Sequence, residues 1–211
     1  MSPIFKEKIM SGEILGPQAL GPLTPLVGEW EGNAGVDVSY HNNDDETSKT
    51  SYFEKAWFKP IPTQQNGKQF LEGLAYKSIA WRHGEEAMNP FHDESVFLLW
   101  DKTRGMVIRT VVFGRGIAIQ AGAQAGPRDK EIRFKATQGD ASFGILQNPY
   151  LMERAEMTNF ESVFKFNDDG TFTHSSDITM KLAALDGLEM HHTDINTLHK
   201  VKSYHPGVEF A

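Results

Sequence analysis

Histidines and carboxylates gather at two places in the sequence. His191 and His192 are adjacent and are followed by Asp194, while His92 is followed directly by Asp93. Imidazole nitrogens and carboxylate oxygens bind transition metals, and the same groups act as general acids and bases near neutral pH. If the fold brings the two places together, they predict a metal or cofactor site or an acid–base pair.

No short motif narrows this choice. The chain has no cysteine, so disulfides, thiolate metal sites and cysteine nucleophiles are excluded. The His-Glu-x-x-His zinc motif, the Gly-x-Ser-x-Gly elbow and the Walker phosphate loop are also missing from the sequence. Gly114 and Gly116 lie between two predicted strands and have no helix N-terminus to offer a phosphate, so we interpret them as a corner of the sheet.

The composition is that of a globular protein with a sizeable core. Hydrophobic residues make up 39% and charged residues 23% of its 211 residues, which suits a single domain. The formal charge is −7 and no basic cluster is interleaved with aromatics, which argues against nucleic acid as a partner. Residues 1–10 alternate charged and apolar residues, so neither a signal peptide nor a membrane span is predicted, and the cytoplasm is the expected compartment.

The elements that must position these residues are short strands joined by turns. Apolar and polar residues alternate over many segments, and the segments are separated by glycine-rich turns such as the one at Asn66 and Gly67. The alternation predicts strands over residues 26–40, 50–58, 69–81, 94–100, 106–113, 117–123, 131–137, 155–166, 171–182 and 188–201.

This order of elements predicts an all-β fold. The chain has no long amphipathic helix and no alternation of strands with helices, so a parallel sheet is disfavoured. Strands that follow one another through short turns suit a closed up-and-down antiparallel barrel, because closure removes the exposed edges. A barrel of about ten strands, like a lipocalin or a fatty-acid-binding protein, leaves room inside for a small apolar ligand.

Two segments fall outside the barrel pattern. Residues 1–25 contain four prolines and are predicted to form an N-terminal arm, followed by the barrel domain over 26–204 and a tail over 205–211. Residues 139–154 lack clean alternation, and a short helix is predicted after Asn148. Both segments are candidates for a lid or for the contacts of a homodimer.

The barrel pattern carries a family resemblance. Gly28, Trp30 and Gly32 resemble the first-strand Gly-x-Trp signature of lipocalin-like and fatty-acid-binding-like barrels. Phe91 to Ser95, then Gly114 to Ala118, follow in an order similar to that of the nitrobindin family of small cytoplasmic barrels. The resemblance is closest over residues 26–137 and looser over 155–201.

The resemblance implies that ferric haem b is held by a histidine of the last strand and acts on nitric oxide and peroxynitrite. An ungapped alignment of that strand puts Thr193 at the ligand position, which is a departure from the family. A shift of one or two residues gives His192 or His191 as the haem ligand, and only one of this pair can face the cavity unless the strand bulges. Asp194 is a candidate to orient the imidazole, and His92 matches a family histidine near the barrel rim.

The sequence leaves three functions open. The first is a haem-binding barrel that uses His191 or His192. The second is a haem-free carrier of an apolar small molecule, favoured by the threonine at position 193. The third is a haem-free enzyme that uses the polar cluster around His92 and Asp194 as acid and base. A non-haem metal site is a related alternative, with His92, His191 or His192, and Asp93 or Asp194 as ligands.

Overall fold

The computed structural model describes residues 17–41, 46–85 and 89–204 of the chain. In these ranges the protein is an antiparallel sheet with three short helical segments, η1 (Pro17–Leu26), α2 (Pro149–Arg154) and η2 (Ala183–Leu185). The strands are β1 (Gly28–His41), β2 (Glu46–Asn66), β3 (Gln69–Arg82), β4 (His92–Asp101), β5 (Met106–Phe113), β6 (Ile117–Gln124), β7 (Glu131–Thr137), β8 (Ile145–Gln147), β9 (Ala155–Phe166), β10 (Phe172–Leu182) and β11 (Glu189–Lys202).

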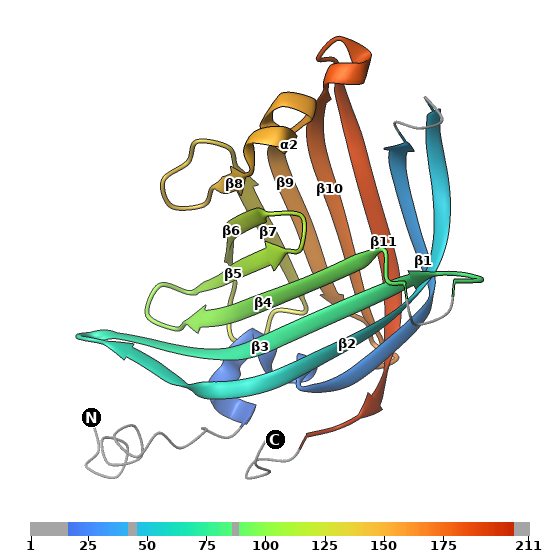
Figure 1. The fold of residues 1–211 in the computed structure, drawn as a ribbon. Helices are drawn as coiled ribbons and strands as arrows, with labels where there is room; N and C mark the ends of the chain where they lie inside the picture. Colours follow the sequence, from blue (N-terminus) through green and yellow to red (C-terminus); the bar gives the residue numbers. More distant parts are fainter. Residues whose placement is uncertain (1–16, 42–45, 86–88, 205–211) are drawn as a thin grey trace.

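The strands close into a barrel. Neighbours in the sheet run in the order β5-β4-β3-β2-β1-β11-β10-β9-β7-β6, and the pairing of β5 with β6 closes the ring. The short β8 pairs with β6 beside this ring, and Figure 1 shows the strands curving around a common axis. Within the described residues the ring therefore contains ten strands, β1 to β7 and β9 to β11, and the predicted closed antiparallel barrel is confirmed.

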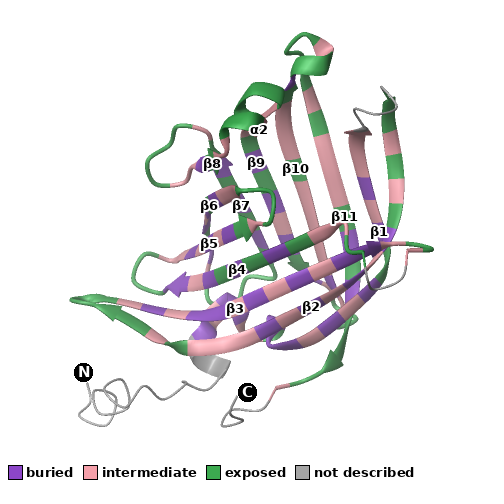
Figure 2. Ribbon diagram, in the orientation of Figure 1, coloured by how far each residue is buried: buried purple, intermediate pink, exposed green. Residues whose placement is uncertain are grey.

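Alternation along the strands separates the barrel interior from its outer surface. On β7, Ile132, Phe134 and Ala136 are buried while their neighbours in the strand are exposed, which gives the banding in Figure 2. The Phe172 ring forms the centre of the apolar core, with Phe164 at 5.1 Å and Phe58 at 5.9 Å in edge-to-face contacts. The predicted boundaries of β5, β7 and β9 agree with those observed.

The second strand is longer than the sequence predicted. We expected it to end at residue 58 because prolines lack the N–H group that a sheet ladder needs, yet β2 continues to Asn66. Its register against β3 shifts between Ile61 and Gln64, around Pro62. Such a bulge leaves a residue out of the ladder, and the strand therefore passes through the proline-containing stretch.

The segment η1 closes one end of the barrel, at the bottom of Figure 1 in blue. It packs against β3 and β4, and Leu23 and Leu26 are fully buried. The buried Trp30 indole N–H donates a hydrogen bond to the Leu26 carbonyl oxygen at 2.6 Å. Within the predicted arm, residues 20–25 pack against the barrel core, because Leu20 and Leu23 are buried at its closed end. Residues 1–16 lie outside the described residues, as does the 205–211 tail.

Glycines of the first strand permit close approach of β11 and its side chains. Gly28 has a φ of 135°, and a Cβ atom there would lie 2.3 Å from the Lys202 carbonyl oxygen. A Cβ atom on Gly32 would lie 2.8 Å from the Asn196 side chain. The Gly28, Trp30 and Gly32 signature thus has a structural explanation, which is close packing at the closed end and along β11.

The irregular segment 139–154 contains β8 and α2. As predicted, a short helix follows Asn148, whose side chain accepts a hydrogen bond from the Leu151 N–H at 3.1 Å. No helix among the described residues is long and apolar enough to cross a bilayer.

Candidate functional site

The end of the barrel opposite η1 is the part where inward-facing side chains are partly exposed. Near Phe172, at the closed end, β10 is buried, but farther along the inward-facing His174, Ile178 and Met180 are only half-buried. Met190 on β11 pairs with Met180 and is also half-buried. Inward-facing side chains are therefore partly exposed at this end, where the strands carry the polar residues described below.

Side chains along the last strand, β11, alternate between the inside and the outside of the barrel. Asn196 and Leu198 are buried in the barrel, so the even-numbered residues of β11, including His192 and Asp194, share the inward face. The odd-numbered His191 and Thr193 lie on the outer face. There, His191 Nδ1 lies 2.7 Å from Asp177 Oδ1 on β10, and the His191 side chain is 62% exposed.

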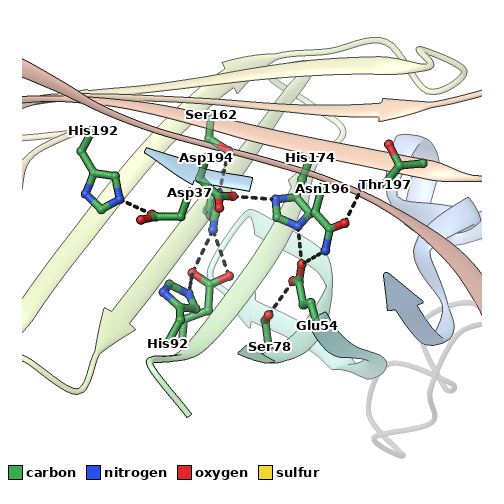
Figure 3. A network of polar contacts seen from close by, with 12 residues as sticks. Asp37, Glu54, Ser78, His92, Ser162, His174, His192, Asp194, Asn196 and Thr197 are labelled. Carbon is green, nitrogen blue, oxygen red and sulfur yellow. Dashed lines mark hydrogen bonds and ion pairs between the residues drawn. The ribbon is translucent and has the colours of Figure 1, made fainter. Parts of the chain in front are cut away.

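His192 contacts a carboxylate from the first strand. Its Nε2 atom lies 2.5 Å from Asp37 Oδ1, although the two residues are 155 positions apart in the sequence (Figure 3). β1 and β11 are neighbours with Asp37 opposite Asp194, which places Asp37 on the same inward face. The Ser39 hydroxyl donates to the other oxygen of Asp37 at 2.7 Å. The Asp37 side chain is only 11% exposed, whereas His192 is 32% exposed.

Glu54 is the centre of a second buried cluster. This β2 carboxylate lies 2.7 Å from His174 Nε2, and it accepts hydrogen bonds from Ser78 at 2.6 Å and Asn196 at 2.9 Å. Burial alone would raise the pKa of Glu54, but the charge of His174 and these hydrogen bonds outweigh burial and lower it. Burial alone would lower the pKa of His174, but the Glu54 charge outweighs it and raises that pKa to about 9. The pair is therefore ionic at neutral pH.

A third cluster joins β4, β5 and β9. Arg109 donates to both carboxylate oxygens of Glu94 at 3.1 and 3.2 Å and to the Ser162 hydroxyl at 2.8 Å. Its guanidinium lies over the Phe160 and Phe164 rings at 5.5 and 5.1 Å. Burial alone would raise the pKa of Glu94, but the charge of Arg109 keeps it well below its usual range. The cluster is a buried ion pair inside the barrel.

His92 lies at the rim, where β4 begins. Its Nε2 atom is 3.7 Å from Glu94, and its ring makes an edge contact with Phe113 at 5.6 Å. Burial opposes protonation, but the hydrogen bond and charge of Glu94 outweigh it and raise the pKa of His92. Asp93 lies on the outer face of β4 in contact with Lys77.

Asp194 lies near His174 rather than His192. Its carboxylate oxygen is 3.7 Å from His174 Nδ1. Burial raises the pKa of Asp194, although the charge of His174 and a hydrogen bond with Tyr52 oppose that effect. Among the described residues, no group of three or more histidine, aspartate or glutamate side chains is arranged to hold a metal ion.

Sequence reasoning missed Asp37, Glu54, Arg109 and His174. Glu54, Arg109 and His174 are polar residues in phase with the buried apolar positions of their strands; His174, for example, lies two residues from the buried Phe172. Asp37 is out of phase with the buried Trp30, because β1 is irregular between Gly32 and Gly35. A charged residue at an inward position was the available signal, because burying a charge is costly unless a partner is nearby. The ionic partners of Asp37, Glu54 and His174 lie 120 or more residues away and are not apparent from the local sequence, whereas Glu94, the partner of Arg109, is on the adjacent β4.

Comparison with known proteins was consistent with this architecture. A family model described as a THAP4-like, heme-binding beta-barrel domain matches residues 19–200. The crystal structure of Rv2717c from M. tuberculosis is similar, with a TM-score of 0.57 and 21% sequence identity over 86% of this chain and 96% of that one. At this identity the likeness concerns the fold. No curated protein matched the sequence.

Proposed function

This chain belongs to the THAP4-like, heme-binding beta-barrel family, and on that premise we propose that it binds ferric haem b at the barrel end opposite η1. His192 is the proposed iron ligand. The observation that carries this choice is the phase of β11, which turns His192 inward and His191 and Thr193 outward. The one-residue shift from Thr193 to His192 therefore supplies an imidazole on the face where the family resemblance requires one.

Half-buried apolar side chains near His192 would pack against a flat, mostly apolar group, beside the polar side chains of Asp37 and Asp194. Ile178 lies opposite His192 on β10, and Met180, Met190 and Phe113 are inward-facing and half-buried at the same end. Apolar walls with a few placed polar groups are typical of cofactor pockets. These residues would flank the macrocycle, and His192 would hold its iron.

When bound, ferric haem held by one imidazole would supply the binding of nitric oxide and the isomerisation of peroxynitrite to nitrate. The residues of this chain would contribute the surroundings of that chemistry. His92 is at the same rim, and its raised pKa favours the protonated imidazole, which can donate to an anionic ligand.

Hemin titration tests this proposal. The purified protein should give a saturable Soret band with one hemin per chain, and His192→Ala should lose the band or shift it. His191→Ala is the matched control, because it removes the neighbouring imidazole on the outer face and should leave the spectrum unchanged. A wild-type protein without a Soret band, or equal loss in both variants, contradicts the proposal.

A haem-free carrier is the second candidate. The first reason is that His192 Nε2, the nitrogen that would bind iron, is already engaged by Asp37. The second reason is the group of apolar side chains at the same end. Native mass spectrometry of freshly purified protein should then show a copurified apolar molecule and no haem.

We also propose a cytoplasmic location, in keeping with the sequence expectation; fractionation of cells checks it.

A further inference from the structure

We propose that the Asp37 carboxylate competes with haem for the Nε2 atom of His192, so that haem uptake requires the Asp37–His192 hydrogen bond to break. We call this hydrogen bond the latch. The inference rests on the proposed function, because it concerns the same imidazole. It adds a residue of the first strand, far from the last strand in sequence, that sets how tightly the protein takes up haem. The result is a carboxylate that restrains the iron ligand instead of supporting it.

The first step is the position of the proton. A carboxylate oxygen and an imidazole lone pair are both acceptors, so a separation of 2.5 Å between Asp37 Oδ1 and His192 Nε2 requires a hydrogen between them. In the resting protein Nε2 therefore carries a hydrogen or shares it with Asp37. A metal ligand must offer a lone pair, so Nε2 cannot bind iron while the contact lasts.

The second step is that the Asp37 carboxylate is held in place. The Ser39 hydroxyl donates to Asp37 Oδ2 at 2.7 Å, and the Asp37 side chain is almost fully buried between β11 and β2. His192 is the more exposed partner of the pair. Release is therefore expected through rotation of the histidine side chain toward the barrel end opposite η1, with Asp37 staying in place.

The third step concerns the other ring nitrogen. Nδ1 is next to the Cβ atom of the side chain, so a metal bound there lies close to the strand backbone. A macrocycle as wide as haem needs clearance on all sides of the iron, and Nε2, at the far end of the ring, offers more of it. A carboxylate that supports a haem ligand is expected to accept from Nδ1–H, with Nε2 left for the metal. Asp37 instead contacts Nε2, so its carboxylate competes with the metal for that nitrogen.

The outer face of the same strand provides an internal comparison. His191 and Asp177 also form a histidine–aspartate contact, at 2.7 Å, but through Nδ1 and on the solvent side, where both side chains are about half exposed or more. Removing the Asp177 carboxylate changes the local charge by the same amount as removing that of Asp37. It leaves the inward-facing imidazole untouched, so it is the matched control.

The experiment measures hemin affinity by Soret titration for the wild type and for Asp37→Asn, Asp37→Ala and Asp177→Asn. A hydrogen bond to a charged group is modest in net strength, so its loss should tighten hemin binding by about tenfold in Asp37→Ala and by less in Asp37→Asn. Asp177→Asn should bind like the wild type. Ser39→Ala, which only loosens the carboxylate, should give a smaller change in the same direction.

Thermal unfolding of the haem-free proteins provides a readout that does not depend on the loaded protein. Asp37→Asn should lower the Tm of the haem-free protein relative to wild type, and saturating hemin should remove most of that difference, because the latch is already open in the bound state. In a His192→Ala background, Asp37→Asn should lower the Tm less or even raise it, because the buried Asp37 carboxylate then lacks the imidazole partner.

The outcomes separate the two proposals. If the wild type binds hemin and Asp37→Ala binds it equally or more weakly, the latch is wrong and the haem proposal stands. If neither wild type nor Asp37→Ala binds hemin, the haem proposal fails and the latch fails with it. If the wild type binds hemin and the Asp37 variants bind it more tightly while Asp177→Asn does not, the latch is supported.

Discussion

Glu54 and His174 are 120 residues apart in the sequence and 2.7 Å apart inside the barrel. They come from β2 and β10, which are separated in the sheet by β1 and β11, so their contact crosses the interior rather than running along a ladder. Ser78 and Asn196 complete the hydrogen bonding of the carboxylate. A buried ion pair with additional hydrogen bonds of this kind links strands that are not neighbours in the closed barrel.

Stability should depend on pH through this pair. The pKa of His174 rises from 6.5 to about 9 on folding, so its contribution is fully present below pH 6.5 and is lost as the pH rises toward 9. Urea unfolding between pH 6 and 9.5 should show that loss in the wild type and not in His174→Gln. His191→Gln, on the outer face, should keep the wild-type profile; if it flattens the profile equally, the assignment to His174 fails.

Breaking the Glu94–Arg109 pair should be costly. Arg109→Met leaves the Glu94 carboxylate buried without its cation, and the free energy of unfolding should fall by about 3–5 kcal/mol. Adding Glu94→Gln should recover part of the loss, because it removes the uncompensated charge. Urea unfolding of both single variants and the double variant measures this coupling. Additive losses would show that the two side chains act independently.

Gly32 should tolerate no side chain. A Cβ atom there would lie 2.8 Å from the Asn196 side chain, which holds Glu54, and 2.9 Å from Leu198. Gly32→Ala should therefore destabilise the barrel by about 1–3 kcal/mol through overpacking. Gly114→Ala is the control, since nothing lies within 4 Å of the position that its Cβ atom would take and its φ is not positive. Equal melting temperatures for the two variants would contradict this account.

The η1 segment should contribute to global stability. Leu23 is fully buried at the closed end, and Leu23→Ala should lower the free energy of unfolding by about 2–5 kcal/mol, mainly through the cavity it leaves. Leu146 on β8 is 74% exposed, so Leu146→Ala should change stability by less than about 0.5 kcal/mol. Chemical denaturation compares the two, and a negligible effect at Leu23 would show that η1 is dispensable for the fold.

Much of the barrel was predictable from the sequence because its strands follow local rules. Alternation with a period of two predicted β5, β7 and β9 with their observed bounds, and the turn glycines separated the strands. The succession of strands through short turns predicted a closed barrel, in which no strand edge is left exposed. The β2 extension and the packing of η1 were not predictable, since a bulge around Pro62 and burial of leucines next to prolines depend on contacts from other strands.

The candidate site was also predictable only in part from the sequence. Local strand geometry was enough to predict that His191 and His192 face opposite sides of the last strand, because adjacent side chains in a strand alternate. Which of them points inward depended on the closed barrel, since the polar stretch from His191 to Asp194 carries no apolar alternation of its own. The contact of Asp37 with His192 likewise exists only in the folded chain. A buried charge is stable only beside a partner, and closing the barrel is what brings that partner from the other end of the chain.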